Sequence, residues 1–219
     1  MLRDRLEQVE ERIARACARA GRRRAEITLV AVTKVFPPEV IREAYELGLR
    51  DFGENYVQEF EGKKPYLAGL AGARFHLIGH LQSNKSRRAA ELFDVIQTVD
   101  SPKLARRLNE AGRPLEVMVE VKLSEEESKS GAGEEETPAL VEAVRACANL
   151  NLTGLMTMPP WSEDAEASRP YFRRLRALAE RCGVRGLSMG MSHDFEAAIE
   201  EGATHIRVGT ALFGPRRRP

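Results

Sequence analysis

Short apolar or β-branched runs alternate with helical stretches along most of this sequence, and this alternation constrains the fold more than any other feature. Eight runs are candidate strands, at residues 27–33, 49–52, 75–78, 95–99, 115–121, 152–156, 186–189 and 205–208. Eight β/α units in series predict a closed (β/α)8 barrel of the TIM type, although a doubly wound open sheet has the same local pattern. At 219 residues the chain has the size of one such barrel, so we expect a single domain over residues 1–219.

Helical patterns fill the gaps between these runs, and glycines mark several helix ends. An extra helix opens the chain, because apolar residues recur every three or four positions from Leu2 to Cys17, before Gly21. Further helices are expected over residues 38–47, 101–111, 137–147, 165–182 and 194–201, with glycines at 48, 112, 183 and 202 suited to their C-terminal ends. The acidic, Ser- and Gly-rich segment 124–136 is predicted to be a mobile loop after the fifth strand.

Charge and cysteine content argue against several classes of protein. The 34 Lys and Arg residues nearly balance the 33 Asp and Glu residues, so the overall electrostatic field does not favour binding to nucleic acid. The basic clusters at 22–24 and 216–218 are expected to be solvated. A charged start and the lack of a long uncharged run predict neither a signal peptide nor a membrane span. Three scattered cysteines without CxxC spacing predict a reduced, cytoplasmic protein. The histidines at 76 and 80 lack an acidic ligand at a fitting spacing, so no metal site is predicted.

Lys34 closes the first apolar run and is the first candidate functional residue. Chemistry in a parallel barrel gathers at the C-terminal ends of the strands, where Lys34 falls. A lysine amine that apolar walls partly desolvate has a lowered pKa and can form a Schiff base with an aldehyde. The alternative is a lysine that leaves the strand and points into water. Two loops near the other end of the chain favour the Schiff-base interpretation.

These loops follow the seventh and eighth strands, where a barrel commonly binds phosphate. They contain Ser188-Met189-Gly190-Met191-Ser192 and Arg207-Val208-Gly209-Thr210. Hydroxyls of Ser192 and Thr210 lie before helix starts, and Gly209 allows the main chain to approach a ligand closely. Plain N-capping would use the same residues. A lysine that binds an aldehyde, together with a phosphate site, suggests pyridoxal phosphate.

Other residues are candidates for the ring of that cofactor. If Val208 packs between sheet and helices, strand alternation points Arg207 into the barrel mouth, where the pyridine nitrogen would accept its hydrogen bond. Asn55 follows the second strand and either contacts the cofactor or caps the next helix. Met156 and Met189 lie at strand ends and either form an apolar wall for the ring or fill the core.

Several segments, taken in order, resemble the YggS/PROSC family, the pyridoxal phosphate homeostasis proteins. They are Leu29-Val30-Ala31-Val32-Thr33-Lys34, Phe52-Gly53-Glu54-Asn55-Tyr56-Val57-Gln58-Glu59, Phe75-His76-Leu77-Ile78-Gly79-His80-Leu81-Gln82-Ser83-Asn84-Lys85, Ser128-Lys129-Ser130-Gly131, Gly154-Leu155-Met156-Thr157-Met158, Leu187-Ser188-Met189-Gly190-Met191-Ser192 and Arg207-Val208-Gly209-Thr210-Ala211-Leu212-Phe213-Gly214. The resemblance implies a barrel like the N-terminal domain of alanine racemase, with the cofactor on Lys34 as an internal aldimine. It also implies phosphate contacts from Ser192, Gly209 and Thr210, and Arg207 near the pyridine nitrogen. Val35 and Phe36 depart from the polar residues of many relatives, and His193 stands at a variable position.

Three functions fit these residues. The first, which we expect, is a cofactor-binding protein of pyridoxal phosphate homeostasis and amino- and keto-acid balance, without robust catalysis of its own. The resemblance implies a monomer or weak dimer; we expect a monomer, with apo-forms of pyridoxal-dependent enzymes as candidate partners. The second is a slow amino-acid racemase with Lys34 as one base and His80 or Tyr56 as the other. The third is a cofactor-free Schiff-base aldolase acting on a phosphorylated sugar, which would be colourless.

One further expectation separates the carrier from the racemase. Racemases with this barrel take a second acid/base residue from an additional β domain and a partner subunit. The sequence ends soon after Arg207-Val208-Gly209-Thr210, so we expect no such domain and an open barrel mouth.

Lys129, in the loop after the fifth strand, is a candidate for transient attachment of the cofactor as it enters or leaves. A solvated lysine in an acidic loop is the alternative.

Overall fold

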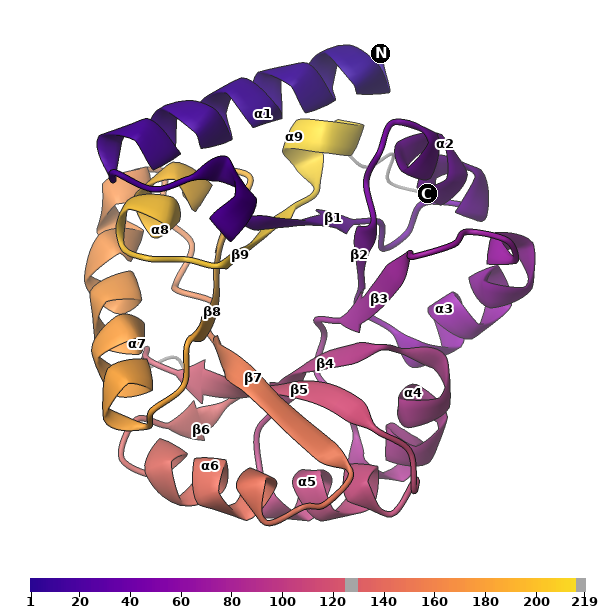
Figure 1. Cartoon of the computed structure of the whole chain (residues 1–219), viewed down its shortest axis with the longest axis vertical. Coiled ribbons are helices and arrows are strands. Elements are labelled where there is room, and N and C mark those ends of the chain that lie inside the picture. Colours follow the sequence, from indigo (N-terminus) through magenta and orange to yellow (C-terminus); the bar gives the residue numbers. More distant parts are fainter. Residues whose placement is uncertain (125–129, 216–219) are drawn as a thin grey trace.

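Eight parallel strands close into a barrel surrounded by helices (Figure 1) in the computed structural model, which describes residues 1–124 and 130–215. The strands are β1 (Thr28–Val32), β2 (Asp51–Glu54), β3 (Arg74–Leu77), β4 (Val95–Val99), β5 (Leu115–Lys122), β7 (Leu150–Met156), β8 (Gly186–Met191) and β9 (His205–Val208). They pair in the order β4-β3-β2-β1-β9-β8-β7-β5, and β4 also pairs with β5. That last pairing closes the sheet, so the (β/α)8 barrel is confirmed and the open doubly wound sheet is excluded.

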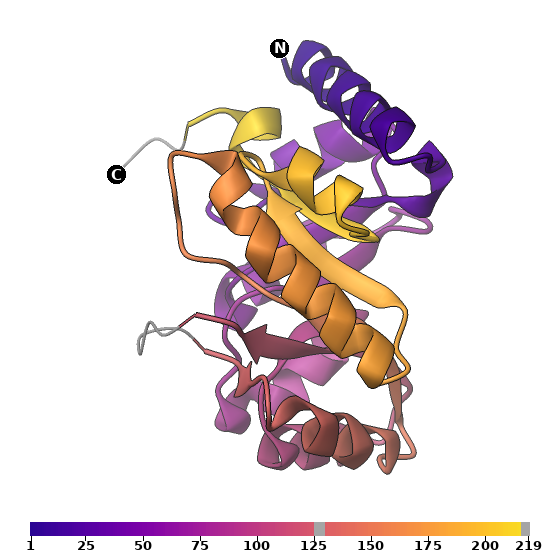
Figure 2. The ribbon, with the colours of Figure 1, turned by 90° about the vertical axis from the view of Figure 1, so that its left-hand side faces the viewer.

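Helices cover the outside of this barrel. They are α1 (Leu2–Arg19), α2 (Pro38–Glu46), α3 (Val57–Lys63), α4 (Ser86–Leu92), α5 (Pro102–Asn109), α6 (Thr137–Arg145), α7 (Arg169–Arg181), α8 (Phe195–Glu200) and α9 (Thr210–Phe213), with 3-10 turns η1 (Arg24–Glu26), η2 (Lys64–Leu67), η3 (Ser83–Lys85) and η4 (Ala165–Ser168). The extra helix α1 packs against α8 and α9. Figure 2 shows α7 in the middle of the outer surface, with α1 and α6 toward opposite ends. Glycines 21, 48, 112, 183 and 202 all have positive φ, as the predicted helix ends require.

Several element bounds differ from the sequence-based expectation: β7 starts at Leu150 rather than residue 152, and the helix predicted over 165–182 is divided into η4 and α7. The second strand starts at Asp51 rather than residue 49, because the Leu49 N–H bonds the Ala44 carbonyl and so belongs to the end of α2. The predicted mobile loop 124–136 contains a short strand, β6 (Ala132–Gly133), which pairs in parallel with the end of β5. Residues 125–129, including Lys129, lie outside the described residues.

The barrel has an apolar outer layer and a partly polar interior. On β9, Ile206 and Val208 belong to the main hydrophobic core, whereas His205 and Arg207 do not. Since neighbouring strand residues face opposite sides of a sheet, Arg207 points into the barrel interior, as predicted. Other buried polar side chains with it are His76, Gln97, Glu120 and Ser188. Burial of so many polar groups needs internal hydrogen-bond partners, and these partners shape the site.

Candidate active site at the strand ends

A cavity of about 230 Å³ lies at the C-terminal ends of the strands. Its lining residues are Val32, Lys34, Asn55, Ile78, Met158, Trp161, Met191, Ser192, His193, Arg207, Gly209 and Thr210. Six of the residues predicted from the sequence therefore meet at one cavity, although positions 34 and 210 are far apart in the chain. An amine, a guanidinium and two hydroxyls lie around a single space.

The turn that carries Lys34 is held by charged residues that the sequence analysis missed. Val35 has a φ of 63°, a conformation that β-branched residues rarely adopt. Its N–H donates a 2.6 Å hydrogen bond to Glu59 Oε1. On the other side of Lys34, the Thr33 hydroxyl donates to Glu54 Oε1 at 2.7 Å. Lys34 is half-buried, and the residues on either side of it, Thr33 and Val35, are both held by hydrogen bonds to glutamates.

Lys63 joins these two anchors. Its ammonium lies 2.9 Å from Glu54 and 2.6 Å from Glu59, and it donates to the Thr33 carbonyl at 3.0 Å. Burial raises the pKa of the Glu54 carboxyl, and Lys63 and the Thr33 hydroxyl oppose that shift. The lysine is almost fully buried, which is unusual unless the charge is paired. Only the spacing of Glu59 and Lys63 at i and i+4 on α3 gave a sequence signal for this cluster.

The hydroxyl of Ser192 lies on the side of the cavity where β9 leads into α9. Ser192 Oγ accepts hydrogen bonds from the Gly209 N–H at 3.1 Å and the Ala211 N–H at 3.3 Å. Helix α8 begins after Asp194, so Ser192 does not cap the helix that follows it and instead satisfies donors at the start of α9. Asp194 accepts from the Met191 N–H at 2.7 Å and so fixes this loop. Main-chain donors and a hydroxyl converge where a phosphate would need them.

Arg207 lines the cavity and is only 3% exposed. Its NH1 donates to Ser188 Oγ at 2.7 Å, and its NH2 donates to the Thr157 carbonyl at 2.9 Å. Burial lowers the pKa of Arg207 to about 10, while Asp194 and Glu120 oppose that change. The guanidinium therefore stays charged at neutral pH, and its remaining N–H groups are available to a ligand in the cavity. Ser188 does not line the cavity and instead holds Arg207.

The remaining predicted residues take different places. Asn55 lines the cavity, and the N-cap residue of α3 is Tyr56, so Asn55 does not cap that helix. Met156 and Met189 are fully buried, and Met189 belongs to the main hydrophobic core. The methionines that line the cavity are Met158 and Met191. Contact of Met156 or Met189 with a cofactor stays a prediction.

The candidates for a second acid/base residue lie beside this cavity. Tyr56 and His80 line a neighbouring hollow that shares Asn55 with it. His80 Nδ1 is 3.5 Å from the Asp100 carboxylate.

Trp161, the single tryptophan of the chain, was not among the residues predicted for the site. It stands 76% exposed at the cavity rim.

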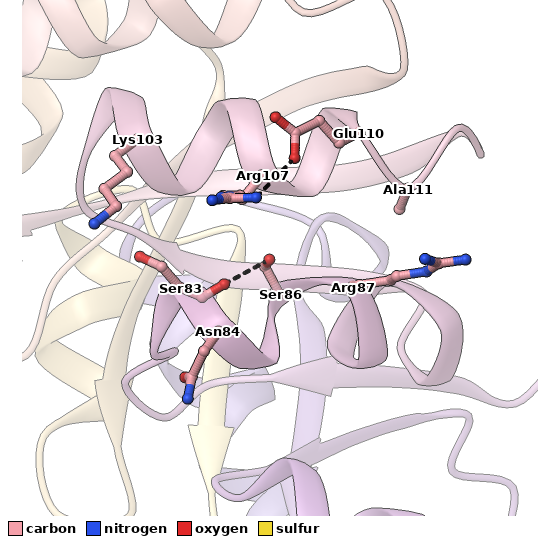
Figure 3. Close-up of a pocket in the computed structure, with 8 residues that line it drawn as sticks. All are labelled: Ser83, Asn84, Ser86, Arg87, Lys103, Arg107, Glu110 and Ala111. Carbon is pink, nitrogen blue, oxygen red and sulfur yellow. Dashed lines mark hydrogen bonds and ion pairs between the residues drawn. The ribbon is translucent and has the colours of Figure 1, made fainter.

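A larger hollow of about 510 Å³ lies outside the barrel, between η3 with α4 on one side and α5 on the other (Figure 3). Lys103 points across it toward Ser83, and Arg107 pairs with Glu110 at 3.3 Å. None of the predicted cofactor-binding residues lines this hollow. The strand-end cavity is therefore the stronger candidate site.

The described residues also bear on metal binding and on membrane crossing. Among residues 1–124 and 130–215, no three His, Cys, Asp or Glu side chains come together in a way that would hold a metal ion. No helix within the described ranges combines the length and apolar character that a membrane crossing requires.

Comparisons with known proteins agree with this geometry. The model of the alanine racemase N-terminal domain matches residues 5–217. A protein of Pseudomonas aeruginosa named pyridoxal phosphate homeostasis protein is 49% identical over 215 residues, which cover 95% of this chain and 93% of that protein. One of the same name from Aquifex aeolicus is 43% identical, over 98% of both chains.

Solved structures extend the likeness to three dimensions. PipY of Synechococcus elongatus PCC7942, solved with PLP bound, superposes with a TM-score of 0.85 at 36% identity, over 98% of this chain and 100% of that one. Alanine racemase of Corynebacterium glutamicum, at 20% identity and a TM-score of 0.69, shares the fold over 96% of this chain and 61% of its own. The chain belongs to the alanine racemase N-terminal domain family, and within it to the YggS/PROSC group of pyridoxal phosphate homeostasis proteins.

Proposed function

We propose that this chain binds pyridoxal 5'-phosphate in the strand-end cavity and acts in the homeostasis of that cofactor and in amino- and keto-acid balance. The observation that carries the proposal is the meeting of Lys34, Arg207 and Ser192 around one cavity. Relatives named for pyridoxal phosphate homeostasis, and a PLP-bound structure of similar fold, support it.

The donor set fits the chemical parts of this cofactor. When bound, pyridoxal phosphate supplies an electrophilic aldehyde and an electron-withdrawing ring. Lys34 supplies the amine for covalent attachment at the aldehyde carbon. Arg207, held by Ser188 and Thr157, directs the rest of its N–H groups to the ring nitrogen. Ser192, Gly209 and Thr210 line the cavity and would surround the phosphate.

The residues around the cavity also favour a carrier over an enzyme with its own turnover. A racemase needs a proton donor on the ring face opposite Lys34. Tyr56 and His80 were the candidates, and they line the neighbouring hollow rather than this cavity. We therefore propose a cytoplasmic, monomeric carrier over residues 1–219, whose partners are apo-forms of pyridoxal-dependent enzymes.

The test of this function is an absorbance spectrum of the purified protein before and after borohydride, with mass spectrometry to locate the reduced adduct. We expect a visible band in the wild type, a reduced cofactor on Lys34, and no such adduct in Lys34→Ala. Lys103→Ala, which changes an exposed lysine far from the cavity, is the matched control and should keep the band. A wild type that stays colourless with added cofactor would overturn the proposal.

A second assay separates carrier from enzyme. The loaded protein is incubated with L- or D-alanine, and separately with an apo-form of a pyridoxal-dependent enzyme. A carrier restores the activity of the acceptor and leaves the alanine enantiomer unchanged over many hours. Multiple turnovers of racemisation that disappear in Lys34→Ala would show catalysis instead.

A further inference from the structure

A continuous chain of buried hydrogen bonds crosses the barrel interior from Arg207 to Asp51. Arg207 NH1 bonds Ser188 Oγ at 2.7 Å, and Ser188 Oγ bonds Gln97 Oε1 at 2.6 Å. Gln97 Nε2 lies 2.9 Å from His76 Nδ1, and His76 Nε2 lies 2.9 Å from Asp51 Oδ1. Ser188, Gln97 and His76 are fully buried. We call these five residues the interior relay.

The interior relay joins strands that do not touch in the sheet. Asp51, His76 and Gln97 come from β2, β3 and β4, whereas Ser188 and Arg207 come from β8 and β9. In the closed sheet β5 and β7 separate β4 from β8, so the bond between Gln97 and Ser188 spans the barrel interior. TIM barrel interiors are usually filled by branched apolar side chains. Because polar residues occupy these positions, the orientation of the Arg207 guanidinium beside the cavity depends on residues across the barrel.

The bonds of the relay run in one direction, away from Arg207. An arginine has donors and no acceptor, so Ser188 Oγ accepts from it. The single hydroxyl proton of Ser188 is then donated to Gln97 Oε1. The amide group of Gln97 must therefore turn its NH2 to His76, whose Nδ1 accepts.

The direction continues to the carboxylate. With Nδ1 occupied as an acceptor, a neutral His76 carries its proton on Nε2 and donates it to Asp51. Burial alone would raise the pKa of Asp51, but the hydrogen bond from His76 holds that pKa below its ordinary value. The relay thus runs from a buried cation to an ionised carboxylate, and Ser188, Gln97 and His76 are each hydrogen-bonded on both sides.

We propose that Ser188, Gln97, His76 and Asp51 are positioning residues that fix the Arg207 guanidinium against the ring nitrogen of the bound cofactor. This inference rests on the proposed function and adds to it Asp51, His76 and Gln97, which, like Ser188, do not line the cavity. Removal of any one of these side chains leaves a buried donor or acceptor of its neighbour unpaired. The hydrogen bonds between that point and Arg207 then lose their fixed direction.

The test interrupts the relay at its midpoint and compares the result with a neighbouring change. Gln97→Met removes both of its links while keeping a similar side-chain volume. Thr98→Val, on the same strand, removes a buried hydrogen bond to the Gly79 carbonyl at 2.9 Å that is not part of the relay. Pyridoxal phosphate is titrated into each apo-protein, and binding is followed by quenching of Trp161 fluorescence and by the position of the visible band.

We expect Gln97→Met to raise the Kd for pyridoxal phosphate roughly tenfold and to shift the band. Thr98→Val should lower the unfolding midpoint yet leave the Kd within about twofold, since its lost bond is outside the relay. Ser188→Ala provides a second interruption if Gln97→Met does not fold. Equal Kd values in wild type and a folded Gln97→Met, or equal losses in both β4 variants, would overturn the relay. Failure of the wild type to bind would instead overturn the proposed function itself.

A measurement on the apo-protein checks the relay without the cofactor. Long-range ¹H–¹⁵N correlation spectra report which ring nitrogen of a neutral histidine carries the proton. The relay requires the proton of His76 on Nε2. A neutral His76 with its proton on Nδ1 would contradict the bond directions and so overturn the inference.

Discussion

Lys63 donates hydrogen bonds to both carboxylate oxygens of Glu54, at 2.9 and 3.0 Å, in the buried space next to the turn that carries Lys34. The same ammonium binds the carbonyl of Thr33, the residue before Lys34. A buried ion pair contributes little net stability when intact, but loss of one partner leaves an uncompensated charge. The pair therefore makes the geometry of the Lys34 turn depend on α3.

Replacement of Lys63 by Met should reduce the free energy of unfolding by about 3 to 5 kcal/mol, because Glu54 is then buried without a cation. Urea unfolding at neutral pH measures the change. The double variant Lys63→Met with Glu54→Gln should recover much of the loss, since neither charge remains. A single variant that loses less than about 1 kcal/mol would show that the ion pair does not hold this turn.

Ser192→Ala should weaken the binding of pyridoxal phosphate roughly tenfold, because it removes one hydrogen bond to a charged phosphate. Pyridoxal, which has no phosphate, is the matched ligand. Its affinity should change little in the same variant. Equal losses for both ligands would place the phosphate elsewhere in the cavity.

Glu120→Gln should change the pH dependence of stability between about pH 4.5 and 7. Burial, and to a lesser degree Asp100, raises the pKa of Glu120 to about 7 from its ordinary 4.5, while Arg207 opposes the shift. The folded state therefore holds this proton more tightly than the unfolded state. Stability present below pH 4.5 is lost as the pH rises through 7, by up to about 3 kcal/mol.

Unfolding free energies of wild type and Glu120→Gln at pH 5 and pH 8.5 measure this effect. The variant should gain about 2 to 3 kcal/mol relative to wild type between the two pH values. A constant packing effect of the substitution cancels in that comparison. A difference that does not change with pH would contradict the raised pKa of this carboxyl.

His205 acts over nearly the same pH range as Glu120, with the opposite sign. Burial and the neighbouring His76 lower the pKa of His205 to about 4, with Asp51 opposing the shift and the nearby cations Arg74 and Arg207 adding to it. The unfolded state takes up the proton first, so stability falls as the pH drops from 6.5 to 4, by up to about 3 kcal/mol. His205→Gln should flatten this fall in urea unfolding curves, and an unchanged slope would contradict the prediction.

Gly190→Ala should destabilise the fold by about 2 to 4 kcal/mol. Gly190 has a φ of 88°, and a Cβ placed there would lie 2.5 Å from the Cβ of Ala198 on α8. Gly112→Ala is the matched control, since it has a φ of 71° but open space around the added carbon. Thermal unfolding of both variants should show the larger loss at Gly190, and equal losses would mean that the contact with α8 relaxes.

The order of strands and helices is largely determined by local sequence patterns. Alternation along β9 was enough to predict that Val208 packs outward and Arg207 inward, and both hold. Loops after neighbouring parallel strands meet at one edge, which is why Lys34, Ser192 and Thr210 were predicted to share a site and do line one cavity. These features depend only on the two-residue period of a strand and on barrel topology.

The sequence by itself therefore determined the order of the β/α units, the helix ends at glycines and the residues at the strand ends, whereas the closure of the sheet between β4 and β5 came from the tertiary structure. Only the tertiary structure decided which buried groups touch. The bonds from Lys63 to Glu54 and from Gln97 to Ser188 depend on the stagger of the strands and on the distance across the closed barrel. The position of Trp161 at the cavity rim likewise follows from the path of the loop after β7. No local pattern contains that information, because the contact between Gln97 and Ser188 joins side chains that are 91 positions apart.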